Sequence, residues 1–107
     1  MTDPPKRKLD FEDLEWHPAS PGIRFKAFQQ NGTQVRLLEL KKGLEHPNWC
    51  ETGHIGYVVK GELEIEFSNK AIKYSEGDGM FILSGEKERH IPRPITDKVI
   101  LFMVEET

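Results

Sequence analysis

The fold of this chain is decided by the stretch Cys50-Glu51-Thr52-Gly53-His54-Ile55-Gly56-Tyr57-Val58-Val59-Lys60-Gly61-Glu62-Leu63. It predicts a strand over residues 54–60 that ends in a turn at Lys60-Gly61. The residues that follow, 62–68, alternate polar and apolar side chains, as a strand does when one of its faces is buried. A thiol and an imidazole, Cys50 and His54, stand at the N-terminal end of this pair of strands and are candidates for chemistry.

Short strands are also predicted on both sides of this stretch. Apolar alternation begins at Ile23, and Asn31-Gly32 is the strongest short-range signal for a hairpin. No apolar period of 3.6 residues continues for more than about two turns, so no long helix is expected. The pattern predicts an all-β sandwich or barrel. The further strands are expected at residues 23–28, 33–40, 71–74, 79–83 and 98–104.

The chain length, 107 residues, is sufficient for one domain with its own core and leaves no room for a second. Residues 1–20 are acidic, contain prolines and show little periodicity. We expect them to form an N-terminal extension that is partly packed on the barrel, with Phe11, Leu14 and Trp16 as candidates for the contact. The barrel domain itself is expected over residues 21–107.

The composition excludes several classes of protein. A formal charge of −3 argues against nucleic-acid binding, which needs a basic surface, and Lys6-Arg7-Lys8 is better explained as a solvated tail. No apolar run approaches the roughly 20 residues of a membrane span, and the first residues do not resemble a secretory signal. A single cysteine, Cys50, excludes an internal disulfide and fits a reducing compartment. We therefore expect a cytoplasmic protein without nucleic-acid or membrane partners.

Much of the chain resembles the cupin family of small β-barrels, and the first of two family motifs lies in the quoted stretch. The motif's glycine is Gly61, and the strand before it is Tyr57-Val58-Val59. Counting back from Gly61, His54 falls at the family's glutamate position, and Cys50 and Asn48 fall at its two histidine positions. The scaffold residues match, whereas these ligand positions carry different side chains.

The second family motif resembles the segment that ends at His90. Gly77, Gly85 and His90 match it, and Leu83 replaces a proline. The resemblance covers about residues 36–104 and implies a small single-domain cupin with a double-stranded β-helix, also called a jelly roll. It further implies that four side chains point into one end of the barrel: Asn48, Cys50, His54 and His90.

Three of these side chains form a plausible set of metal ligands. A thiolate and imidazoles suit Zn²⁺, and Fe²⁺ less strongly, and three protein ligands leave one coordination position open. Without the family's carboxylate, the set Cys50, His54 and His90 favours zinc. Asn48 is a poor ligand for such a metal, and we expect it to hydrogen-bond the molecule at the open position.

Each ligand candidate also has an explanation without a metal. Cys50 fits a small buried hydrophobe, His54 a core histidine bonded to a backbone carbonyl, and His90 an exposed residue of a charged loop. A thiol near two imidazoles can also have a lowered pKa and act as a nucleophile or redox sensor. No acid that would orient such a nucleophile is evident in the motif, which disfavours this last alternative.

Aromatic side chains near the motifs are candidates for a substrate pocket at the mouth of the barrel. With Asn48, the expected substrate-binding residues are Trp49, Tyr57 and Phe81, unless these rings only pack in the core or at its rim. Arg36 is a charge within a predicted strand. It would favour an anionic substrate if it points inward, although an outward position in solvent is more common.

Three functions remain open at this point. The first is a small cupin of unassigned activity that binds a divalent metal and acts on a small polar molecule, and the sequence does not decide whether it is an enzyme. The second is a non-enzymatic module that binds or senses a small ligand without metal. The third is a degenerate barrel with a structural role. We also expect a homodimer, because the resemblance implies a barrel of a kind that commonly pairs through edge strands and because the strand over residues 98–104 is apolar on both faces.

Overall fold

The computed structural model describes residues 4–44 and 49–107, in which nine β-strands and two 3₁₀ helices are the regular elements. No helix in these residues is long and apolar enough to cross a membrane. The 3₁₀ helices are η1 (Phe11–Asp13) and η2 (Glu86–Glu88). The strands are β1 (His17–Ser20), β2 (Ile23–Gln30), β3 (Thr33–Lys41), β4 (His54–Lys60), β5 (Leu63–Phe67), β6 (Ala71–Tyr74), β7 (Gly79–Ile82), β8 (His90–Pro94) and β9 (Lys98–Glu106).

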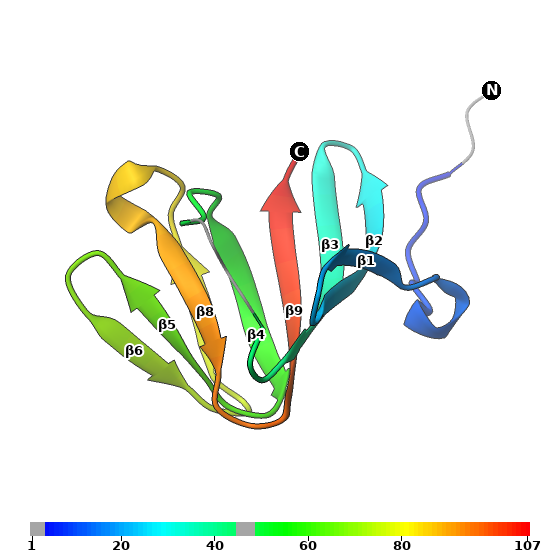
Figure 1. Cartoon of the computed structure of the whole chain (residues 1–107). Helices are drawn as coiled ribbons and strands as arrows, with labels where there is room; N and C mark the ends of the chain where they lie inside the picture. Colours follow the sequence, from blue (N-terminus) through cyan, green and yellow to red (C-terminus); the bar gives the residue numbers. More distant parts are fainter. Residues whose placement is uncertain (1–3, 45–48) are drawn as a thin grey trace.

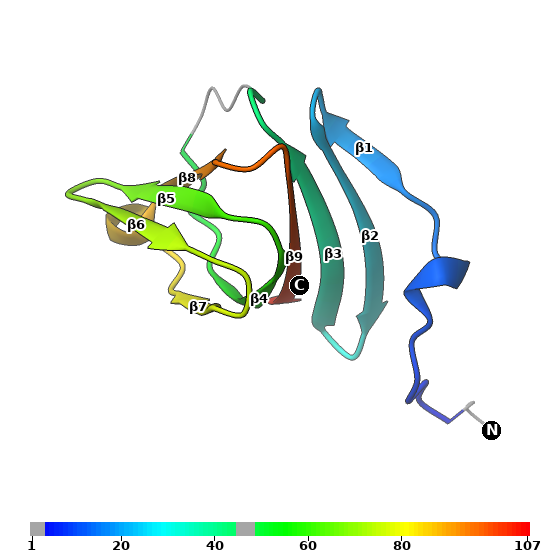
Figure 2. The same ribbon diagram turned by 90° about the horizontal axis from the view of Figure 1, so that it is seen from below.

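The strands form two antiparallel sheets on opposite sides of one core (Figures 1 and 2). The larger sheet has the strand order β1-β2-β3-β9-β4-β7, and the smaller sheet has the order β6-β5-β8. Strand β9, the last in the chain, lies between β3 and β4 and pairs with both. The predicted all-β fold class is therefore confirmed.

The core follows from the two-residue alternation of the strands. Val99, Leu101 and Met103 of β9 point inward and are at most 2% exposed. Leu40 of β3 and Ile65 of β5 meet them from the two sheets. Burying one such side chain contributes about 1.5–3 kcal/mol. A shift of β9 by one residue would turn this row to solvent, so the burial also fixes the register.

The turn from β4 to β5 depends on Gly61, whose φ is 85°. A side chain at this position would disfavour the left-handed backbone and would also overlap the carbonyl oxygen of Lys98. This is the physical reason for a glycine at this point of the first motif.

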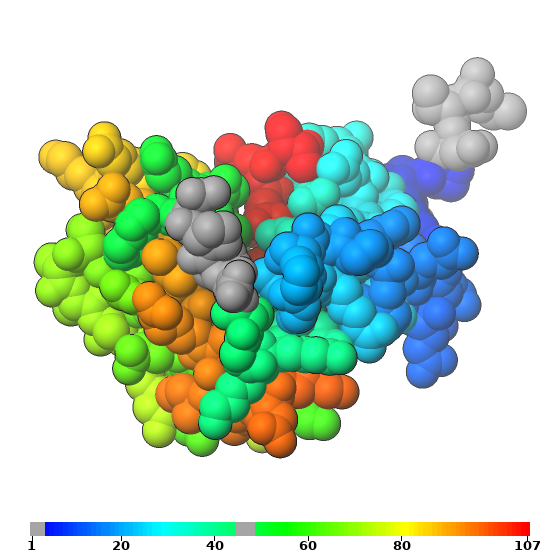
Figure 3. Space-filling model, in the orientation of Figure 1, coloured from blue at the N-terminus to red at the C-terminus, as the bar shows by residue number. Residues whose placement is uncertain are grey.

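The N-terminal segment lies against the larger sheet, where it is drawn in blue beside the cyan strands (Figure 3). Strand β1 pairs with β2, and the ring of Phe11 is edge-on to Phe102 of β9, with 6.2 Å between the centroids. The guanidinium of Arg24 lies 4.1 Å from the ring centroid of Trp16. Lys26 Nζ donates a hydrogen bond of 2.6 Å to the carbonyl oxygen of Phe11. These contacts attach the segment to β2 and to the outer face of β9.

The strands predicted from alternation are confirmed, and their ends differ from the prediction by no more than two residues. Strand β8 was not predicted, and His90 is its first residue rather than part of a loop. This strand contains Pro92 and Pro94, and a proline cannot donate to a ladder of hydrogen bonds, so the sequence does not indicate a strand here. The strand lies at the edge of its sheet, where a missing donor costs little.

Candidate metal centre

Cys50 and His90 lie opposite one another on neighbouring backbone segments. Each donates its backbone N–H to the carbonyl oxygen of the other, and both hydrogen bonds are 2.9 Å long. The side chains of such a directly opposed antiparallel pair project to the same side. The backbone therefore holds the thiol and one imidazole side by side.

The third ligand candidate, His54, is the first residue of β4 and pairs with Ile82 of β7. The short loop between Cys50 and His54 is tied to the segment after β7, because Gly53 donates its N–H to Ser84 Oγ at 2.8 Å. A Cβ at Gly53 would overlap the backbone of Ile82 and Ser84. The close approach that only glycine allows therefore fixes where β4 begins and where the ring of His54 lies.

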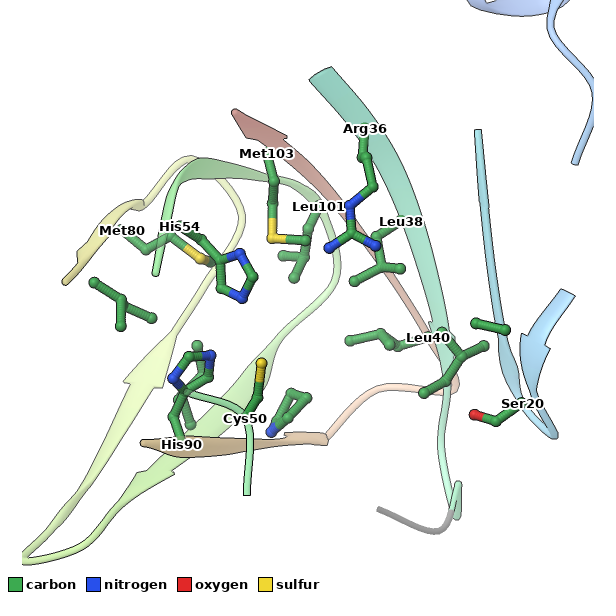
Figure 4. Close-up of a pocket in the computed structure, with 15 residues that line it drawn as sticks. Ser20, Arg36, Leu38, Leu40, Cys50, His54, Met80, His90, Leu101 and Met103 are labelled. Atoms are coloured by element: carbon green, nitrogen blue, oxygen red, sulfur yellow. The ribbon is translucent and has the colours of Figure 1, made fainter. Parts of the chain in front are cut away.

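The candidate ligand atoms of Cys50, His54 and His90 all lie within 4.8 Å of one another. The three side chains point toward one another at one side of a cavity of about 250 Å³ (Figure 4). The two rings are nearly perpendicular, with 5.1 Å between their centroids. His90 is only 3% exposed, so it is not the exposed loop residue that the sequence left as an alternative.

Both imidazoles have one ring nitrogen engaged with a further group. His90 Nδ1 lies 3.0 Å from the carbonyl oxygen of Glu88, and His54 Nδ1 lies 2.6 Å from Glu105 Oε2. The contact to Glu105 is an ion pair when the ring of His54 is protonated. In both rings Nε2 is the nitrogen that remains for a metal. Carbonyl and carboxylate partners of this kind orient the histidines of metal sites.

Glu105 connects His54 to a hydrogen-bond network on the inner face of the larger sheet. Arg36 donates from Nε and Nη2 to its two carboxylate oxygens, at 2.7 and 2.8 Å. Gln34 Nε2 adds a hydrogen bond of 3.0 Å, because it stands opposite Glu105 in the pairing of β3 with β9. The carboxylate is thus buried with its charge compensated by a bidentate guanidinium.

The ionisable groups of the cluster shift one another's pKa. His54 and then His90 lower the pKa of Cys50 to about 5. Burial alone would lower the pKa of His54, but the Cys50 thiol and the Glu105 carboxylate raise it to about 9. Burial alone would raise the pKa of Glu105, whereas its contacts with His54 and Arg36 lower it to about 2. At neutral pH the sulfur is therefore a thiolate, the form that binds metals, while the ring of His54 is protonated, so a metal at its Nε2 would displace that proton.

The donor set fits a zinc ion. Zinc at about 2.3 Å from sulfur and about 2.0 Å from nitrogen, in a tetrahedron, places its ligand atoms roughly 3.5 Å apart. The candidate atoms lie within 4.8 Å, so each side chain reaches that spacing by moving roughly 1 Å. Cys50, His54 and His90 would hold the ion and leave it one coordination position for a water or a small molecule, and all three residues line the cavity.

The residues predicted to bind a substrate lie elsewhere. Tyr57 is 50% exposed and Phe81 is 72% exposed, because each occupies an outward position of its strand. The ring of Trp49 stacks under the guanidinium of Arg89, with 4.8 Å between Cζ and the ring centroid. None of these three lines the cavity, and Asn48 lies outside the described residues. Aliphatic side chains form most of the cavity wall instead.

Sequence analysis did not identify Glu105, although a signal for it exists. Leu101 and Met103 point inward, and the same alternation continued by two residues places Glu105 inside. Arg36 follows the same rule, because it lies two residues before the inward-pointing Leu38 of β3. Of the two orientations considered for Arg36 in the sequence, the structure therefore has the inward one.

Two antiparallel sheets around a cavity with a cluster of candidate ligands at one side define the cupin fold, as the resemblance implied. An RmlC-like cupin protein from Ralstonia eutropha JMP134 matches 95% of this chain and 69% of its own, with a TM-score of 0.75 and 23% identity. KdgF from Halomonas sp. matches 96% of both chains, with a TM-score of 0.75 and 20% identity. A sugar phosphate isomerase of the cupin superfamily from Silicibacter pomeroyi matches 94% of this chain and 76% of its own, with a TM-score of 0.78 and 18% identity.

No protein-family model matches the sequence, and neither does any curated protein. The solved structures therefore show the fold, over almost the whole chain. Fold and site together define a small cupin-fold protein whose Cys50, His54 and His90 could bind a metal.

Proposed function

We propose that this cupin-fold protein binds one divalent metal ion, zinc in preference to iron, through Cys50, His54 and His90, and that it holds a small molecule in the adjoining cavity. The observation that carries the proposal is the convergence of three donor atoms to within 4.8 Å from three separate segments. Each imidazole also contacts an outer partner through its Nδ1, which is the carbonyl of Glu88 for His90 and the carboxylate of Glu105 for His54. Such outer partners are typical of histidines that bind a metal.

The types of donor atom support zinc over iron. One sulfur and two nitrogens form a softer set than the two imidazoles and one carboxylate of oxygen-activating iron sites. In the described part of the chain the carboxylate of Glu105 contacts His54 and does not belong to the cluster of candidate ligand atoms. The substitution of the family's carboxylate by an imidazole therefore supports the zinc assignment.

Each group at the site has a separate task in this proposal. A bound zinc ion supplies an electrophilic centre that polarises a carbonyl group or lowers the pKa of a bound water. Glu105 orients the ring of His54, and Arg36 in turn holds Glu105 with two hydrogen bonds. The aliphatic wall of the cavity offers an apolar surface beside the cluster. These parts support the binding and orientation of a small molecule.

Elemental analysis of untagged protein by plasma mass spectrometry tests the proposal. We expect about one zinc ion per chain in the wild type and only traces in the Cys50→Ala/His54→Ala variant. His17→Ala is the matched control, because His17 is an exposed histidine of β1 outside the cluster. Equal traces of metal in all three proteins, even after incubation with zinc, would contradict the proposal and favour a ligand-binding module without metal.

We also propose that the protein forms a homodimer through the outer face of β4 and β7. Ile55 and Phe81 are paired across these strands, and both are exposed together with Tyr57. Exposed apolar groups of this kind mark interaction surfaces, and a twofold axis lets one such surface pack on its copy. Light scattering should give twice the chain mass of 12.4 kDa, and the Phe81→Glu variant should be monomeric. A monomeric wild type at high micromolar concentration would rule this dimer out.

A further inference from the structure

We infer that the cavity beside the cluster takes a small monocarboxylate with an apolar body. Three independent properties of the cavity lead to this class of ligand: its wall, its charge and its volume. The inference rests on the proposed metal site, because the metal supplies one of the charges that the ligand balances.

The wall of the cavity is apolar over most of its extent. Beyond the cluster it is built by aliphatic and thioether side chains that come from both sheets (Figure 4). Among the described residues that line it, Ser20 carries the single hydroxyl. A hydrocarbon chain gains about 25 cal/mol for each Å² that it buries there, whereas a sugar hydroxyl would lose water without gaining a partner. The principal wall residues are Leu38, Leu40, Ile65, Met80, Leu101 and Met103.

The charges around the cavity leave room for one negative group. Arg36 and Glu105 neutralise each other through their two hydrogen bonds. A zinc ion with one thiolate and two neutral imidazoles keeps a single positive charge. Apart from Arg36 and the cluster itself, no described residue of the lining is ionisable. A monoanion therefore balances the site, whereas a phosphate dianion would leave an uncompensated charge in an apolar cavity.

Arg36 adds a reason for the anion to be a carboxylate. Glu105 uses the Nε and Nη2 groups of Arg36, and within the described residues Nη1 makes no hydrogen bond. The guanidinium points into the cavity (Figure 4), and its contact with Glu105 keeps it close to His54. Planar guanidinium N–H groups match the geometry of carboxylate oxygens. The polar end of the cavity therefore offers a carboxylate both a cation and hydrogen-bond donors.

The volume limits the size of the molecule. The cavity has a volume of about 250 Å³. This is smaller than the usual pocket for a drug-sized ligand. Hexanoate, with eight non-hydrogen atoms, has the size, charge and apolar body that the cavity requires, and it serves as the probe.

Isothermal titration calorimetry of zinc-loaded protein tests the inference, with the metal content measured on the same sample. Gluconate keeps the six carbons and the carboxylate but carries hydroxyls, and hexanamide keeps the apolar body but lacks the charge. Glucose 6-phosphate has neither the apolar body nor the carboxylate. We expect hexanoate to bind at least tenfold more tightly than each of these three, with a negative heat-capacity change from burial of its chain.

Two variants test whether the probe occupies this cavity. Ala19 and Ala71 are both exposed strand residues, and of the two only Ala19 lines the cavity. We expect Ala19→Phe to weaken hexanoate binding at least tenfold and Ala71→Phe to leave it unchanged, while both variants keep their zinc.

The possible results separate the inference from the proposed function. If zinc is bound but hexanoate binds no more tightly than gluconate or hexanamide, or binds equally well to Ala19→Phe, the inference is wrong and the metal site stands. If the wild type takes up no zinc, the proposed function fails, and the inference fails with it.

Discussion

Two arginine–glutamate pairs lie on opposite faces of the larger sheet and differ in what surrounds them. On the outer face, Arg24 of β2 donates from Nε and Nη2 to Glu39 of β3, at 3.0 Å each. On the inner face, Arg36 of β3 donates the same two groups to Glu105 of β9, at 2.7 and 2.8 Å. Both carboxylates are almost fully buried. The two pairs have the same chemistry, so a difference in role must come from their neighbours.

The neighbours of the two pairs are indeed different. Trp16 of the N-terminal segment stacks on Arg24, so the outer pair helps to attach that segment to the sheet. Glu105 has a third partner, the imidazole of His54, which also faces a thiol and a second imidazole. A buried ion pair alone therefore does not identify a functional site. An imidazole held between a carboxylate and other candidate metal ligands is an arrangement typical of metal sites.

Loss of a ligand should break the inner site most strongly. We expect His54→Ala to lower the affinity for zinc by more than about 100-fold, beyond the 10–100-fold effect of removing an outer partner. The Arg36–Glu105 pair remains in this variant, so the fold should persist. Competition with a chromophoric chelator measures the affinity, and unchanged zinc affinity would show that His54 is only a core residue.

Matched substitutions of the two carboxylates should separate the roles of the pairs. We expect Glu105→Gln to lower zinc affinity about 10–100-fold, because the ring of His54 loses its charged partner. Glu39→Gln should leave zinc affinity unchanged. Breaking a buried ion pair costs about 3–5 kcal/mol, and the cost should be smaller for Glu39, because Arg24 is more exposed than Arg36. Equal zinc affinities in the two variants would show that Glu105 has no role in the metal site.

The fold could be predicted because short-range signals specify most of it. The glycine turn at Gly61, the hairpin at Asn31-Gly32 and the alternation of each strand act over a few residues, and all are present in the structure. Strand β8 could not be predicted, since Pro92 and Pro94 are tolerated only because of the edge position that the assembled sheet gives them.

The site could be predicted only in part. The resemblance to the two family motifs implied that Cys50, His54 and His90 lie together, but the partner of His54 comes from β9, far along the chain. The pairing of β9 with β3 and β4 is long-range and sets which carboxylate reaches the imidazole. Tyr57 could have been excluded from the cavity, because in a strand a residue three positions after an inward His54 points outward.

Loss of the Trp16 ring, which stacks on Arg24, should lower the stability of the fold without changing the candidate metal site. We expect Trp16→Ala to lower the free energy of unfolding by about 1 kcal/mol or more, because Arg24 loses its cation–π contact and the ring's buried area is lost. Zinc affinity should be unchanged. Trp16→Phe is the control and should recover part of the loss. Urea denaturation measures the difference, and altered zinc affinity in Trp16→Ala would show that the two faces are coupled.

The smallest expected effect concerns pH and the outer pair alone. Hydrogen bonds from Arg24 hold the pKa of Glu39 below its ordinary value of 4.5. Because the folded pKa lies below the unfolded one, this stabilisation is fully present above about pH 4.5 and is lost as pH falls through the folded pKa. The advantage of wild type over Glu39→Gln in urea denaturation should therefore shrink between about pH 6 and pH 3. Glu105 is present in both proteins, so its own titration cancels in the difference. An advantage that stays constant over this range would mean that the carboxylate of Glu39 gains nothing from its charge, and that the outer pair holds the sheet by packing.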